Sequence, residues 1–193
     1  MKTIFLRILA LYCITTVLPD FSLAQHLPAN IPLRVVIIRH GEKPDSGYNL
    51  SCQGYNRSLE LPGVITSLFG VPDYTYVPNI RTGISTRSVR MYQTIVPFAV
   101  QYDLMINTRY GETDSVALAM DILKKTGTVL VVWDGRNIPP IARNLGLKNS
   151  DPKWEETDYD SIWIIDFVRN KDGGLQPELT RAKENINPSL KCK

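Results

Sequence analysis

The segment LRVVIIRHGEKP, residues 33–44, decides the fold. Its first half, residues 33–38, is a short apolar run rich in β-branched side chains, which is typical of a strand buried on both faces of a parallel sheet. Arg39, His40 and Gly41 follow this strand directly. Because ligands of open α/β sheets bind beyond the carboxyl ends of the strands, we expect these residues to lie in a functional loop.

Strands and helices alternate along the rest of the chain. Further strands are predicted at residues 74–77, 104–106, 128–133 and 161–168, and helices at residues 51–69, 85–100, 113–125 and 137–145. The first helix should break near Pro62 and the second should bend at Pro97. A short hairpin or an edge strand is expected after residue 170. This order predicts a single α/β domain with a mostly parallel central sheet flanked by helices on both faces.

The composition excludes several classes of function. At 193 residues, with 44% hydrophobic and 21% charged residues, the chain has the make-up of one globular domain. Its formal net charge of +3 is not gathered into a basic block, so we expect no nucleic-acid partner. Two histidines and three cysteines give no zinc-ligand spacing, and no glycine-rich nucleotide motif is present. We therefore expect neither a metal nor a cofactor.

The first 24 residues have the pattern of a secretory signal peptide. A basic start precedes an apolar run over residues 8–18, and small residues lead up to Ala24. The run is too short for a membrane span. We predict cleavage after Ala24, a mature domain over residues 25–193, a secreted or periplasmic location, and no membrane attachment after cleavage.

Two cysteines, Cys52 and Cys192, remain in the predicted mature chain. In an oxidising compartment they can form a disulfide that ties the C-terminal tail to the early part of the domain. The alternative is two unpaired thiols, and the spacing does not decide between them.

The loop after the first predicted strand carries groups suited to phosphoryl transfer. An imidazole such as that of His40 is a usable nucleophile when a backbone carbonyl fixes its second nitrogen. The planar guanidinium of Arg39 matches the oxygens of a phosphate. The structural alternatives are a core histidine that caps a strand end and, for Arg90, a surface arginine on a helix.

Arg39-His40-Gly41 resembles the signature of the histidine phosphatase superfamily, which has the phosphoglycerate mutase-like fold and whose histidine becomes transiently phosphorylated. The resemblance extends in order through residues 49–57, 88–94, 131–139 and 154–163, and is closest to a subgroup that opens with Arg-His-Gly-Glu-Lys-Pro. It implies a phosphate pocket built from Arg39, His40 and Arg90, and hydrolysis of small phosphate monoesters without a metal.

One position departs from the family pattern. The family has a second histidine after the Trp-Glu pair of its fourth segment, and Gly135 aligns there. Loss of one transition-state donor commonly costs about 10²–10³ in rate, so we expect weakened activity. Arg136 lies next to this position, and we hypothesise that its guanidinium enters the space that Gly135 leaves.

A general acid is needed to protonate the leaving alkoxide. Glu42 is the first candidate, Asp134 the second, and Glu112 a third on a loop.

The leading hypothesis is an exported phosphomonoesterase-like protein. The alternatives are an inactive pseudophosphatase that binds a phosphorylated or anionic ligand or a protein partner, and a structural protein with a vestigial pocket. The short connecting segments predict an open pocket, and the substrate and oligomeric state are left open.

Overall fold

Six strands form one central sheet in the computed structural model, which describes residues 34–80, 88–147, 153–172 and 174–192. The predicted signal peptide lies outside these ranges. The strands are β1 (Arg34–Arg39), β2 (Tyr74–Tyr76), β3 (Ile106–Asn107), β4 (Thr128–Trp133), β5 (Ser161–Arg169) and β6 (Leu175–Lys183), in the order β3-β2-β4-β1-β5-β6. The first four run parallel, whereas β5 and β6 are antiparallel additions on the far side of β1.

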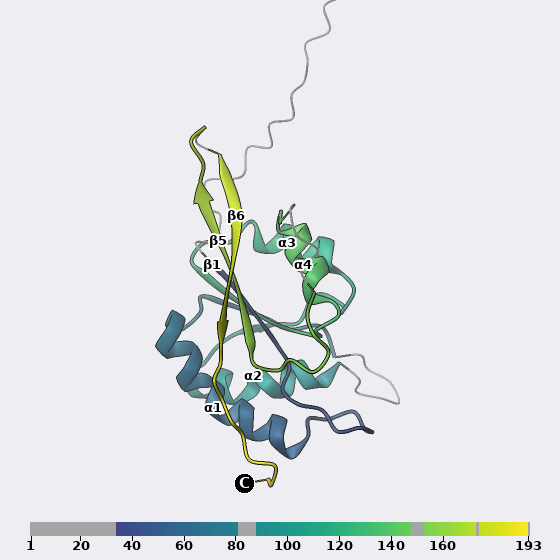
Figure 1. The fold of residues 1–193 in the computed structure, drawn as a ribbon. Helices are drawn as coiled ribbons and strands as arrows, with labels where there is room; N and C mark the ends of the chain where they lie inside the picture. Colours follow the sequence, from purple (N-terminus) through teal and green to yellow (C-terminus); the bar gives the residue numbers. More distant parts are fainter. Residues whose placement is uncertain (1–33, 81–87, 148–152, 173, 193) are drawn as a thin grey trace, which may run out of the picture.

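Four helices cover the two faces of this sheet. They are α1 (Cys52–Phe69), α2 (Val89–Tyr102), α3 (Ser115–Ile122) and α4 (Ile138–Asn144). Figure 1 shows α1 and α2 on one side of the sheet and α3 and α4 on the other. The predicted fold class, a mostly parallel sheet with helices on both faces, is confirmed.

Strand β1 lies at the centre of the core. Val35 and Ile37 pack on the face covered by α3 and α4, and Val36 and Ile38 pack on the face covered by α1 and α2. Neighbours on both sides, β4 and β5, satisfy its backbone hydrogen bonds. Because both faces are buried, the strand is apolar at every position from residue 35 to residue 38.

One local prediction was wrong. Helix α1 continues through Pro62, although a proline costs about 3 kcal/mol inside a helix. Burial of Leu61 and Ile65 against the sheet favours the continuous helix. The polar region after residue 170 forms a nine-residue strand, β6, at the edge of the sheet, so the predicted edge strand is confirmed. Its Pro177 is compatible with a strand at a sheet edge, where an N–H is not needed on the open side.

A disulfide joins Cys52 to Cys192 and fixes the segment after β6 on the start of α1. The same segment is held by Asn56, whose Nδ2 donates to the carbonyl oxygens of Ser189 at 2.8 Å and Lys191 at 2.7 Å. The question that the spacing left open is thus answered in favour of a disulfide. None of the described helices is long and apolar enough to cross a membrane.

Replacing both cysteines by alanine should lower the free energy of unfolding by about 2–5 kcal/mol, because the bond closes a long loop in the unfolded chain. Urea denaturation of the double variant, of oxidised wild type and of wild type with a reductant measures this. The two disulfide-free samples should agree. An unchanged denaturation midpoint in both would show that the bond contributes nothing to stability.

Candidate active site

His40 lies directly beyond the end of β1, and only 1% of it is exposed. Its backbone N–H donates to the carbonyl oxygen of Trp133, the last residue of β4, at 3.1 Å. Its ring Nδ1 lies 2.6 Å from the carbonyl oxygen of Gly41. Since a carbonyl oxygen can only accept, this contact assigns the proton to Nδ1. In the neutral imidazole, the lone pair is therefore on Nε2.

The loop that carries His40 lies against the first turn of α1 with no room for side chains between them. A Cβ on Gly41 would lie 2.8 Å from the carbonyl oxygen of Gly54, and a Cβ on Gly54 would overlap the backbone of Glu42. Ser51, the N-cap of α1, donates from both its N–H and its hydroxyl to the carbonyl oxygen of Glu42, at 2.9 and 3.1 Å. The loop is thus fixed to both β4 and α1.

Asp134 faces Nε2 of His40. Its Oδ2 lies 3.9 Å from Nε2, and its Oδ1 accepts from the N–H and the Nε of Arg136 at 3.0 and 3.3 Å. Burial acts to raise the pKa of this carboxyl, but the contacts with His40 and Arg136 outweigh burial, and its pKa is lowered. Asp134 is therefore a carboxylate at neutral pH.

The guanidinium of Arg39 is buried beside His40. Its Nη1 donates to the carbonyl oxygens of Glu156 and Asp158, and its Cζ lies 4.1 Å from the centre of the Tyr159 ring. The ring of Tyr159 also lies 6.0 Å from that of His40, centre to centre. Sequence reasoning missed Tyr159, because nothing near it in the chain points to His40.

Arg90, in the first turn of α2, is held by the loop that follows the His40 segment. Its Nε donates to the carbonyl oxygen of Asn49 at 3.1 Å and its Nη2 to that of Gly47 at 2.5 Å. Within the described parts of the chain, neither Arg39 nor Arg90 forms an ion pair with a carboxylate. Both guanidinium groups are oriented by neutral oxygens, so their charge is not neutralised.

Comparison with known proteins identifies the fold. No protein-family model and no curated protein matches the chain. A solved structure of mycobacterial glucosyl-3-phosphoglycerate phosphatase in complex with inorganic phosphate superimposes with a TM-score of 0.54 at 14% identity, over 80% of this chain and 99% of that one. The protein histidine phosphatase SixA complexed with tungstate gives a TM-score of 0.51 at 14% identity, over 78% of this chain and 97% of that one. The chain has the histidine phosphatase fold.

Glu42 is part of a buried ion network behind the His40 loop. Its carboxylate accepts from the Nε of Arg57 at 3.0 Å and from the Nη2 at 2.8 Å. The Nη1 of Arg57 donates to Glu184 at 2.6 Å and lies 3.6 Å from Asp160. The carboxylate of Glu42 is thus occupied by a cation, which favours a structural role over proton donation. The third acid candidate, Glu112, contacts Trp133, whose Nε1 donates to its carbonyl oxygen at 2.8 Å.

Gly135 is buried next to Arg39. A Cβ at this position would lie 3.1 Å from Cδ1 of Trp154 and 3.2 Å from Nε of Arg39. The side chain of Arg136 is 87% exposed and contacts Asp134. In this histidine phosphatase fold, therefore, the guanidinium that borders the space beside Gly135 is that of Arg39.

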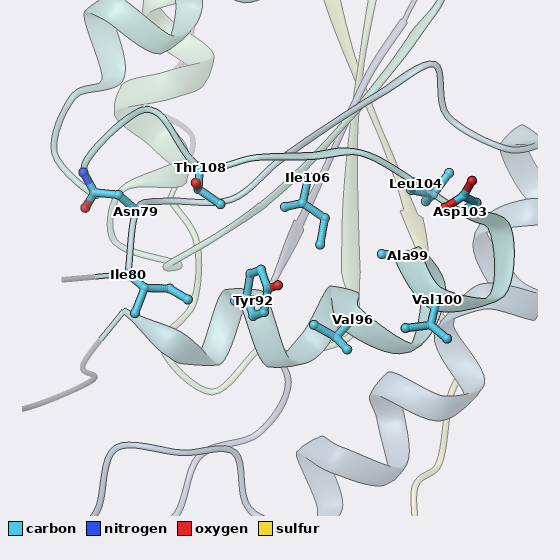
Figure 2. A pocket seen from close by; sticks show the side chains of 10 residues that line it. All are labelled: Asn79, Ile80, Tyr92, Val96, Ala99, Val100, Asp103, Leu104, Ile106 and Thr108. Carbon is cyan, nitrogen blue, oxygen red and sulfur yellow. The ribbon is translucent and has the colours of Figure 1, made fainter. Parts of the chain in front are cut away.

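A groove of 820 Å³ runs between α2 and the segment of β3 (Figure 2). Tyr92, Val96 and Val100 line it from α2, and Ile106 lines it from β3. At 3.6 residues per turn, Tyr92 and Val96 lie on a different side of α2 from Arg90. The groove is therefore separate from the residues around His40. Among the described residues, no cluster of three or more His, Cys, Asp or Glu side chains is arranged to hold a metal ion.

Gly135→Ala should lower the free energy of unfolding by about 1–3 kcal/mol, because the added methyl group presses on Arg39 and Trp154. The control is Gly63→Ala in α1, where a Cβ meets nothing within 4 Å. That change should instead stabilise the protein by about 0.5–1 kcal/mol, because alanine favours the helix. Chemical denaturation measures both. Equal stability of the Gly135→Ala protein and wild type would mean that both neighbours move aside freely.

The ion network should make stability depend on pH. Burial raises the pKa of Glu184 from 4.5 to about 7; Arg57 opposes this, and Asp160 and Glu42 add to it. The folded protein then keeps a proton that the unfolded chain loses, so stability should fall as the pH rises from about 4.5 to about 7.

Glu184→Gln removes this titration. The free energy of unfolding of Glu184→Gln minus that of wild type should therefore be larger at pH 8 than at pH 5, as measured by urea unfolding at both values. Glu178→Gln, at an exposed position of β6, is the control. A difference between wild type and Glu184→Gln that is the same at both pH values would contradict the raised pKa.

Proposed function

We propose that the protein is a member of the histidine phosphatase superfamily, of the Arg-His-Gly-Glu-Lys-Pro subgroup, and hydrolyses small phosphate monoesters through a phosphohistidine at His40. The contact between Nδ1 of His40 and the carbonyl oxygen of Gly41 carries this proposal, because it leaves the lone pair of Nε2 as a nucleophile. The two solved structures of the same fold, which hold phosphate and tungstate, support a pocket for a tetrahedral anion.

In the first step, the lone pair of Nε2 attacks phosphorus, the ester P–O bond breaks, and the leaving oxygen takes a proton. In the second, water attacks the phosphohistidine, the N–P bond breaks, and phosphate and neutral His40 are released. We assign Arg39 and Arg90 to the phosphate oxygens. Their two positive charges match a phosphate dianion, and Arg90 exchanges its carbonyl partners for phosphate oxygens.

We assign the proton transfers to Asp134, whose Oδ2 lies 3.9 Å from Nε2 of His40. It is ionised in the free protein, and a phosphate dianion beside it raises its pKa through like-charge repulsion. It can then donate to the leaving oxygen and, as a carboxylate, accept a proton from the attacking water. Arg136 orients Asp134, and Glu42 holds the loop through Arg57.

A second candidate function is a pseudophosphatase that binds a phosphorylated ligand without hydrolysing it. The observation in its favour is Gly135, where the family has a second histidine and where Arg39 and Trp154 leave little room for a side chain. The cost of that missing donor, about 10²–10³ in rate, would make turnover slow.

We also propose that the protein is exported. The charge and apolar pattern of residues 1–24 supports this, as does the disulfide between Cys52 and Cys192, because disulfides persist in oxidising compartments.

The test compares wild type, His40→Ala and His26→Ala, since His26 is the only other histidine in the chain. With p-nitrophenyl phosphate, wild type and His26→Ala should release phosphate and His40→Ala should not. With a ³²P-labelled monoester, wild type and His26→Ala should become covalently labelled, and the label should be labile in acid and stable in base, as expected for phosphohistidine. Equal, nonzero rates for wild type and His40→Ala would refute the nucleophile. Binding of phosphate by wild type without any label or release would favour the pseudophosphatase.

A further inference from the structure

The hydroxyl of Thr94 connects the His40 loop to the helix that carries Arg90. Its Oγ1 accepts from the backbone N–H of Gly41 at 2.9 Å and donates to the carbonyl oxygen of Arg90 at 2.8 Å. Only 1% of Thr94 is exposed, so water does not compete for these bonds. One buried hydroxyl thus joins two segments that are about fifty residues apart in the chain.

The residue that Thr94 holds is also the one that orients the imidazole. The carbonyl oxygen of Gly41 accepts a hydrogen bond from Nδ1–H of His40, and the N–H of Gly41 donates to Thr94. A shift of Gly41 would therefore move the acceptor that fixes the tautomer and the ring of His40. Thr94 acts on Nε2 through Gly41 and not by contact with it.

A threonine hydroxyl that donates to the carbonyl four residues earlier is common in helices and has no functional meaning by itself. Thr66 in α1 makes that bond to Pro62 at 2.7 Å. What distinguishes Thr94 is the second bond, in which it accepts from the loop of the nucleophile. Bonds through His40 and Ser51 tie the same loop to β4 and α1, so Thr94 adds the link to α2.

We propose that Thr94 is a positioning residue for the phosphoryl transfer proposed above, on which this inference rests. Its hydroxyl fixes the position of the imidazole of His40 relative to the guanidinium of Arg90. Phosphorus held by the arginine then lies in line with Nε2. A displacement of 1 Å in such an arrangement can cost about 10² in rate.

Thr94→Val keeps the shape of the side chain and removes both hydrogen bonds, whereas Thr94→Ser keeps them. The control is Thr66→Val, which removes a comparable helix bond in α1, away from the His40 loop. Rates of phosphoenzyme formation, kcat and KM should be measured per folded molecule, with the folded fraction taken from thermal unfolding.

Thr94→Val should lower kcat and the rate of labelling by about 10–100-fold, Thr94→Ser should restore most of the loss, and Thr66→Val should leave both unchanged. A purely structural role predicts lower thermal stability with kcat unaltered. The proposal is overturned if Thr94→Val keeps kcat within about twofold of wild type.

A second measurement does not depend on turnover. In ¹⁵N spectra of the imidazole, wild type and Thr94→Ser should show the Nδ1–H tautomer of His40, and Thr94→Val a mixture of tautomers. If wild type has no phosphatase activity but this pattern is found, the proposed function fails and the positioning role of Thr94 stands. An unchanged tautomer in Thr94→Val would refute that role.

Discussion

The backbone contact between Gly41 and Gly54 is the constraint on which the rest of the site depends. Because neither residue has a side chain, the loop after β1 lies directly on the first turn of α1. This approach brings Glu42 within reach of both Ser51 and Arg57. A side chain at either glycine would separate the loop from the helix and displace His40, since His40 is held between this loop and β4.

The chain uses its buried and half-buried arginines in two electrostatically different ways. Arg57 is surrounded by carboxylates, which raises its pKa and makes it a structural cation. Arg39 and Arg90 are oriented by backbone carbonyl oxygens, which fix the guanidinium planes but leave the charge available. Arg39 and Arg90 thus keep their positive charge, which is why the proposed function assigns them to the phosphate oxygens.

The sequence predicted the features that local pattern determines. The continuous apolar runs of β1 and β4 identify a parallel sheet buried on both faces. Because the two strands are parallel neighbours, residues 39–42 and 134–136 both lie at their carboxyl ends. Features that depend on distant partners could not be predicted. Arg57 and Glu184 are 127 residues apart and form an ion pair that no local pattern indicates. Glu42 is the first acid candidate because it lies two residues after His40 in the chain. Its ion pair with Arg57 depends on how α1 packs against the loop, which the local sequence does not indicate.

The roles of Gly135 and Arg136 show the same limit. The pattern along the chain does not show what surrounds Gly135, and here Trp154 and Arg39 do so from two other segments. Similarly, residues 175–183 read as polar and irregular because most side chains of β6 are exposed. Pairing with β5 along all nine residues is what makes this segment a strand.

The proline in β6 has a consequence for the behaviour of the protein in concentrated solution. An open sheet edge can template the addition of a strand from another molecule, which is a common start of aggregation. Pro177 has no N–H to offer, and Glu178, Arg181 and Lys183 place charges along the same edge. At the opposite edge of the described sheet, β3 has only two residues. Within the described residues, both edges are thus poor templates: one because of its proline and its charged side chains, the other because of its short length.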